Sequence, residues 1–158
     1  MQMLLADSCF NITHDSFVND LDETIQRAEN HKIKYFFAPA SKESEIENLL
    51  HYCKVYEDKV YCSIGIHPHH ASELKPDTIA NLKPHLDSKY VRSIGEVGLD
   101  YFRNFQSPQI QIKCFETFVE LAIQENYPLF LHHREAFNAV SYTHLRAHET
   151  GRNLVCRL

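Results

Sequence analysis

The chain of 158 residues has no C-x-x-C pair, and its five cysteines are an odd number. Both features argue against a disulfide framework. No apolar run approaches the roughly 18 residues that a membrane helix needs. No charged segment followed by an apolar one opens the chain as a signal peptide would. These absences lead us to expect a soluble cytoplasmic protein without a membrane partner.

Basic residues are also in the minority. Lys and Arg total 16 against 21 Asp and Glu, which gives a formal net charge of -5. This balance disfavours a nucleic-acid clamp that covers the whole surface but permits a local basic site. The composition is 44% hydrophobic and 23% charged, which is typical of a globular protein, and the length allows one domain.

Residues 140–158 differ in character from the rest of the chain. They read VSYTHLRAHETGRNLVCRL and show no clear helical or strand period. The letters resemble the in-frame translation of a transposon-end sequencing adapter, with two fixed blocks on either side of a variable index. We therefore expect this segment to be an adapter-derived artefact that forms no domain. We also expect His144, His148 and Cys156 not to be metal ligands, and the natural chain to continue past residue 139 with other residues.

Residues 1–139 alternate between strand-like and helix-like patterns. Strands are expected at residues 3–6, 33–38, 60–66, 90–94 and 129–131, and helices near 17–28, 46–53, 77–82 and 108–126. The helix caps are expected at Asp15 or Ser16, in a capping box from Ser44 to Glu47, and at Ser107 before Pro108. The third helix is expected to end near Pro84.

This alternation is typical of βαβ units and predicts a parallel sheet covered by helices. Two architectures fit it. Five strands can form a complete flavodoxin-type domain, or they can be the first five units of a (β/α)₈ barrel, which needs roughly 250 residues.

The polar residues gather where the expected strands end. Asp7, His67, Glu96 and His132 each follow apolar strand residues. In a closed parallel barrel such positions converge at one mouth, whereas an open sheet would spread them along its edge. Carboxylates and imidazoles together are a ligand set for a divalent metal. The nearby Tyr101, Phe102 and Phe105 are interpreted as loop packing.

Glu96 and His132 are the strongest candidates, because a carboxylate at a buried strand end is costly unless it is paired or bound to metal. His67 and His69 flank Pro68, which stiffens the loop. No glycine-rich phosphate loop follows the first strand.

Three segments resemble the TatD family of metal-dependent deoxyribonucleases. They are GIHPHH from Gly65, IGEVGLDYFRNF from Ile94 and PLFLHHREAF from Pro128. Their order and spacing match as well, over nearly all of residues 3–139. The resemblance implies an amidohydrolase-like TIM barrel, here its first five βα units, with one or two divalent ions (Mg²⁺, Mn²⁺ or Zn²⁺) at the carboxyl end of the strands.

The resemblance also implies the roles of individual residues. Glu96 and His132 fall on metal-ligand positions of the family motifs. Substrate binding falls on His67, His69, Asp100 and Arg134. DNA is the implied substrate, with 3′-to-5′ exonuclease action among members, and no obligate protein partner is implied.

Two features depart from the common family pattern. Many members begin with D-x-H-x-H, whereas this chain has Asp7, Cys9 and Asn11 at the corresponding places. These three are candidates for a position at or near the metal, where Asn11 offers a neutral oxygen and Cys9 favours zinc over magnesium. The family's later histidine and catalytic aspartate fall beyond residue 139, so we expect the chain as written to be inactive. A flavodoxin-like binding or regulatory domain, and a metal hydrolase of another ester or amide, are the alternatives.

Overall fold

The computed structural model describes residues 4–141. Up to Arg134 the chain forms five strands, four α-helices and three 3-10 helices (η), and residues 137–141 are also helical. In chain order they are β1 Leu5–Asp7, η1 Asp15–Phe17, α1 Leu21–Asn30, β2 Ile33–Pro39, η2 Glu43–Glu45, α2 Ile46–Val55, β3 Val60–Ile64, η3 Pro68–Glu73, α3 Thr78–Leu86, β4 Val91–Asp100, α4 Pro108–Glu125 and β5 Leu129–Arg134. His144, His148 and Cys156 lie outside the described residues, and the interpretation of residues 140–158 stays a prediction.

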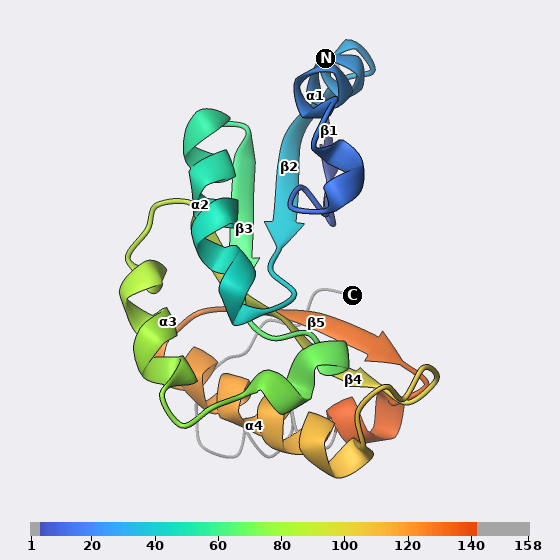
Figure 1. Cartoon of the computed structure of the whole chain (residues 1–158), viewed down its shortest axis with the longest axis vertical. Coiled ribbons are helices and arrows are strands. Elements are labelled where there is room, and N and C mark those ends of the chain that lie inside the picture. The colour runs from blue at the N-terminus through green and yellow to red at the C-terminus, as the bar shows by residue number, and fades with distance from the viewer. Residues whose placement is uncertain (1–3, 142–158) are drawn as a thin grey trace.

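The strands of residues 4–141 form one parallel sheet in the order β1-β2-β3-β4-β5. A flavodoxin-type sheet has the order 2-1-3-4-5, in which the direction of the connections reverses. Here every strand lies beside its neighbour in the sequence, so right-handed crossovers place the helices on one face. Figure 1 shows α2 beside β3, and α4 next to β4. The strand order excludes the flavodoxin alternative.

The sheet is strongly curled. The rings of Phe37 in β2 and Phe130 in β5 lie 5.1 Å apart between centroids, although β3 and β4 separate their strands. In a flat sheet, three strand spacings would hold them about 14 Å apart. The turn is visible in Figure 1, where β2 and β3 run along the long axis and β5 runs across it. The five βα units therefore form a curled half-barrel, as the barrel interpretation predicts.

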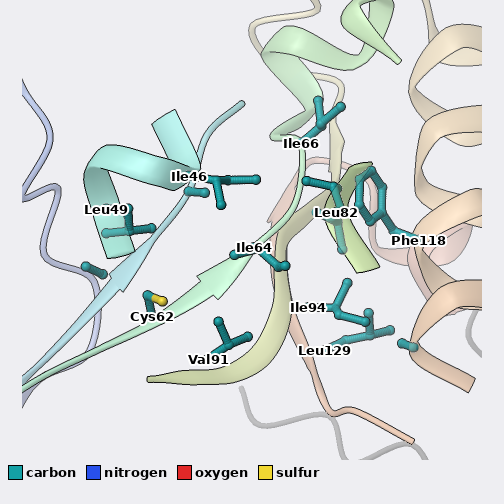
Figure 2. Close-up of a cluster of buried hydrophobic side chains, with 14 of the residues drawn as sticks. Ile46, Leu49, Cys62, Ile64, Ile66, Leu82, Val91, Ile94, Phe118 and Leu129 are labelled. Atoms are coloured by element: carbon teal, nitrogen blue, oxygen red, sulfur yellow. The ribbon is translucent and has the colours of Figure 1, made fainter. Parts of the chain in front are cut away.

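The core fills the space between the convex face of the sheet and the helices. Along β3, Val60, Cys62 and Ile64 are fully buried, while Tyr61 between them is only half-buried. Ser63 is fully buried as well, so the carboxyl half of β3 is covered on both faces, as expected of a central strand in a parallel sheet. Figure 2 shows Phe118 of α4 pointing into the same cluster as Ile64 and Leu82.

The first helix begins later than predicted, and neither Asp15 nor Ser16 caps it. These residues belong to η1, whose cap is His14. Helix α1 begins after Asp20, whose carboxylate accepts from the Thr24 hydroxyl at 3.2 Å. The apolar spacing that starts at Phe17 spans both elements, and so it did not mark the boundary between them.

Two further helix boundaries differ from the prediction. Ser44 lies in η2, and the reach-back cap comes from Glu45, which accepts from the Ser41 backbone N–H at 3.1 Å, rather than from Glu47. Helix α3 runs through Pro84 to Leu86. Pro84 has no N–H to donate, so α3 continues through it with one backbone hydrogen bond missing near its end.

The helix α4 has the predicted ends. Its N-cap Ser107 accepts from the Ile110 N–H, Pro108 is the first helical residue, and Asn126 ends the helix in the left-handed conformation. Strand β4, in contrast, runs six residues past the expected end at Ile94, to Asp100. Pairing with β5 extends it over a segment whose two glycines argue locally against a strand.

Among residues 4–141, no helix has both the length and the apolar character needed to cross a bilayer.

We predict that Phe118→Ala lowers the free energy of unfolding by about 3–5 kcal/mol, because it leaves a cavity at a fully buried position. Urea denaturation followed by circular dichroism measures the change. Ile110→Ala, in the same helix at a position 41% exposed, is the control and is expected to cost about 1 kcal/mol or less. Equal losses in the two variants would contradict this account of the core.

Candidate metal centre

The candidate site lies where β3, β4 and β5 bring polar side chains to the carboxyl end of the sheet. His67 directly precedes η3, and His69 lies within it. Glu96 and Asp100 come from β4, and His132 comes from β5. The structure thus brings together five residues that the sequence singled out, from three consecutive βα units.

A bulge in β4 directs Glu96 to the site. Gly95 pairs with Phe130 and Val97 pairs with Leu131, so Glu96 between them has no partner in β5. Such a bulge turns one side chain away from its expected direction. A glycine is required at position 95 because β5 approaches β4 closely there. A Cβ on Gly95 would lie 2.3 Å from the Phe130 carbonyl oxygen.

Three histidines form a cluster that is able to bind a metal ion. One ring nitrogen each of His67, His69 and His132 lies within 4.8 Å of the other two. The His67 Nε2 atom is 3.0 Å from His132 Nδ1. A carboxylate oxygen of Glu96 is also 3.0 Å from His132 Nδ1 and 3.9 Å from His67 Nε2.

Asp100 is the anion at the centre of this cluster. Its side chain is 1% exposed. Its Oδ2 atom lies 2.7 Å from His69 Nε2 and 3.3 Å from His132 Nε2, and its Oδ1 accepts from the Arg103 backbone N–H at 2.8 Å. A buried carboxylate is stable only with such partners.

These contacts assign the histidine tautomers. Ionised Asp100 can only accept, so His132 carries a proton on Nε2, which leaves the Nδ1 lone pair of the neutral ring facing Glu96. His67 Nδ1 accepts from the His69 backbone N–H at 3.2 Å, so its proton lies on Nε2 and points into the site. In the neutral ring, His132 Nδ1 accepts from the His67 Nε2–H at 3.0 Å and faces a second acceptor, Glu96; when His132 is protonated, its Nδ1–H donates to Glu96.

The pKa values follow from the same contacts. Burial lowers the pKa of His67 to about 4, and His132 adds to this effect. Burial opposes protonation of His132 too, but Glu96 and Asp100 outweigh it and raise the pKa of His132. For Asp100, burial is outweighed by the Arg103 N–H and the two histidines, and the pKa falls to about 2. At neutral pH, His67 is uncharged and Asp100 is ionised.

Two glutamines that the sequence analysis did not single out hold the site in place. The side chain of Gln111, 1% exposed, accepts from the Asp100 backbone N–H at 2.8 Å and donates to its carbonyl at 3.1 Å. Gln106 donates to the His69 carbonyl at 3.1 Å. Gln111 shares the buried stripe of α4 with Cys114 and Phe118. A polar residue in an apolar stripe is the signal that could have identified it.

Asp7, Cys9 and Asn11, at the end of β1 and in the loop after it, contribute less to the candidate metal centre. Asp7 accepts from the Cys9 backbone N–H at 3.0 Å, and Cys9 and Asn11 are exposed. Burial, Glu96 and Asp7 raise the pKa of the Cys9 thiol, so Cys9 lies within the field of Glu96. Within residues 4–141, no hydrogen bond links these three side chains to the histidine cluster. Their role at or near a metal stays a prediction.

The loop between β4 and α4 does not pack as predicted. Tyr101 is half-buried against the core, but Phe102 is 56% and Phe105 is 62% exposed. The loop-packing interpretation is therefore wrong for the two phenylalanines, which are largely exposed. Arg134, at the end of β5, stacks on Phe102 with 3.9 Å between guanidinium carbon and ring centroid.

Comparison with known proteins shows to which family the chain belongs. A family model described as TatD related DNase matches residues 6–155. The chain belongs to the TatD-related DNase family. The 3'-5' ssDNA/RNA exonuclease TatD of Erwinia amylovora is 35% identical over 132 residues, which are 84% of this chain and 51% of that protein. The protein of the same name from Edwardsiella piscicida is 34% identical over the same shares. The chain thus spans about half the length of the curated TatD relatives it matches.

Solved structures show the same fold. A hydrolase TatD family protein from Entamoeba histolytica superposes with a TM-score of 0.82 at 24% identity, over 96% of this chain and 56% of that one. A TatD homolog from Escherichia coli K12 gives a TM-score of 0.79 at 21% identity, over 91% and 56% of the two chains. The half-barrel of this TatD-family chain is therefore an arrangement that these structures share.

We predict that Gly98→Ala disrupts the site through the backbone. A Cβ there would lie 2.0 Å from the His132 carbonyl oxygen, and Gly98 has a φ of +144°. Strain of this kind costs about 1–3 kcal/mol, and moving β5 separates His132 from Glu96. Urea denaturation and Mn²⁺ titration should both report a loss. Val97→Ala, which removes neighbouring methyl groups without touching the strand spacing, should lower stability but retain Mn²⁺ binding. Undiminished Mn²⁺ binding by Gly98→Ala would contradict the prediction.

Proposed function

We propose that the intact protein is a metal-dependent hydrolase that cleaves DNA phosphodiester bonds, with 3′-to-5′ exonuclease action on single strands. Membership of the TatD-related DNase family and the names of its relatives support this function. The observation that carries it is the pair of acceptors, Glu96 Oε1 and His132 Nδ1, that face each other at 3.0 Å. A proton on His132 Nδ1 or a cation between the two atoms relieves the repulsion between these acceptors, so metal binding would compete with protonation of His132.

Glu96 and His132 are the residues that would hold the ion. The donor set of one carboxylate and one imidazole suits Mn²⁺ or Zn²⁺, and Mg²⁺ through the carboxylate. Asp100 accepts the other ring proton of His132, which is the usual arrangement of a carboxylate behind a metal-ligating histidine. A divalent ion held there supplies polarisation of a phosphoryl oxygen and activation of a water molecule.

The remaining site residues would bind the phosphate. His67 is neutral at pH 7 and directs its Nε2–H toward His132 Nδ1 at 3.0 Å; if that nitrogen holds an ion, the N–H would be free for a phosphate oxygen. Arg134 offers a fixed positive charge. Because the chain as a whole carries a net charge of -5, this contact is local, and affinity for DNA should be modest and sensitive to salt. The expected inactivity of the chain as written and its cytoplasmic location stay predictions.

In the intact protein, Glu96→Ala and His132→Ala are each expected to reduce Mn²⁺-dependent release of nucleotides by about 100-fold or more, because each removes a ligand of the ion. The assay follows shortening of a 5′-labelled single strand on a denaturing gel, with and without EDTA. Glu47→Ala, which removes an exposed carboxylate of α2, is the matched control and should leave the rate unchanged. Full activity of Glu96→Ala would overturn the proposed function.

Metal binding should depend on pH through His132. Its pKa is raised above the ordinary value, and the ion must replace the proton on Nδ1, so affinity should rise with pH until His132 is deprotonated. Below that pKa, Mn²⁺ affinity should fall about tenfold per pH unit for one released proton. His67, whose pKa is about 4, adds nothing above pH 5.

Calorimetric titration of the 158-residue chain with Mn²⁺ in buffers of different ionisation enthalpy measures both the affinity and the released proton. His51→Gln, at an exposed position in α2, is the control and should not alter the pH dependence. Affinity that rises as the pH falls would contradict the assignment of His132.

A further inference from the structure

An aromatic and basic rim borders the candidate metal centre. We define this rim as Phe102, Arg103, Phe105 and Arg134, from the β4–α4 loop and the end of β5. The two phenylalanines are 56% and 62% exposed, although exposing a phenylalanine side chain to water is energetically unfavourable. The two arginines are its cations, in a chain that is acidic overall.

The rim touches the metal centre directly. The rings of Phe105 and His69 lie edge to face, with centroids 4.7 Å apart. His69 in turn contacts Asp100 at 2.7 Å. Phe105 is therefore one ring contact away from the cluster that includes Glu96 and His132.

The loop that carries the rim is held at both ends. The Arg103 N–H donates to Asp100, the Tyr101 N–H donates to the Arg134 carbonyl at 2.9 Å, and Gln106 donates to the His69 carbonyl. The exposed rings thus sit on a fixed frame. A preorganised surface loses little conformational entropy on binding.

We propose that Phe105 stacks on a base of a single-stranded nucleic acid whose phosphate lies at the metal centre, and that Phe102 positions Arg134 for a neighbouring phosphate. This proposal rests on the hydrolase function proposed above and adds the recognition of the base. Aromatic rings beside arginines match a nucleotide, which has an apolar face and an anionic backbone. An apolar peptide or lipid tail would instead bury the two arginines without partners.

The geometry also favours a single strand over a duplex. Bases inside a duplex have both faces covered by their neighbours, so an exposed ring can stack only on a base that has left the stack. Because every base has such a face, the rim should not distinguish strongly between sequences.

The test compares two oligonucleotides of equal charge. Fluorescence anisotropy measures the binding of the 158-residue chain to a labelled eight-nucleotide poly-dT strand and to an abasic strand of the same length. EDTA is present, so that no hydrolysis can occur. The chain should prefer the strand with bases by roughly 5- to 150-fold, which corresponds to the stacking of one base.

Phe105→Leu, which keeps an apolar side chain but removes the ring, should abolish most of this preference. Phe102→Leu should retain the preference but weaken the binding of both strands, and should reduce the slope of log affinity against log salt by about one. Phe137→Leu is the matched control, since Phe137 is 65% exposed and packs against His133 outside the rim. It should behave like the unmodified chain.

The outcomes separate this proposal from the proposed function. Equal affinity for the two strands, or a preference that survives Phe105→Leu, overturns base stacking, whether or not the intact protein hydrolyses DNA. A preference that disappears in Phe105→Leu supports it, and a nuclease assay of the intact protein with Mn²⁺ then tests hydrolysis independently.

Discussion

The buried carboxylate of Asp100 is the constraint on which the candidate site depends. A charge this far from solvent would cost several kcal/mol without partners, and the structure surrounds it with N–H donors from His69, His132 and Arg103. In meeting that need, the fold also fixes the tautomer of His132 and the orientation of His69. The Nδ1 atom that His132 turns toward Glu96 is thus placed there as a consequence of how Asp100 is stabilised.

This stabilisation works only because the backbone of β4 is held from its other side. Gln111 of α4 occupies both the N–H and the carbonyl of Asp100. The bulge at Glu96 and the close approach of β4 to β5 at Gly98 then set the distance between Glu96 and His132. In this TatD-family chain, the same residues therefore stabilise the fold and position the candidate metal ligands. A change in the spacing of β4 and β5 alters both.

Much of the architecture was predictable from local patterns. The strand expected from Val60 and the cap and first-turn proline at Ser107 and Pro108 mark elements that the structure contains. Boundaries were less predictable where two short elements share one apolar spacing, as at Phe17 and Leu21, or where pairing extends a strand, as in β4. In those places the deciding contacts come from residues distant in the sequence.

The sequence by itself determined which side chains are present at the strand ends, and hence that carboxylates and imidazoles would share one edge of a parallel sheet. It also contained the motifs that identify the family. Only the tertiary structure decided which of these groups donate and which accept, because that depends on the distances from Asp100 and Glu96 to each ring. It also decided that Phe102 and Phe105 face solvent, since exposure is a property of the packed loop and not of the residue type.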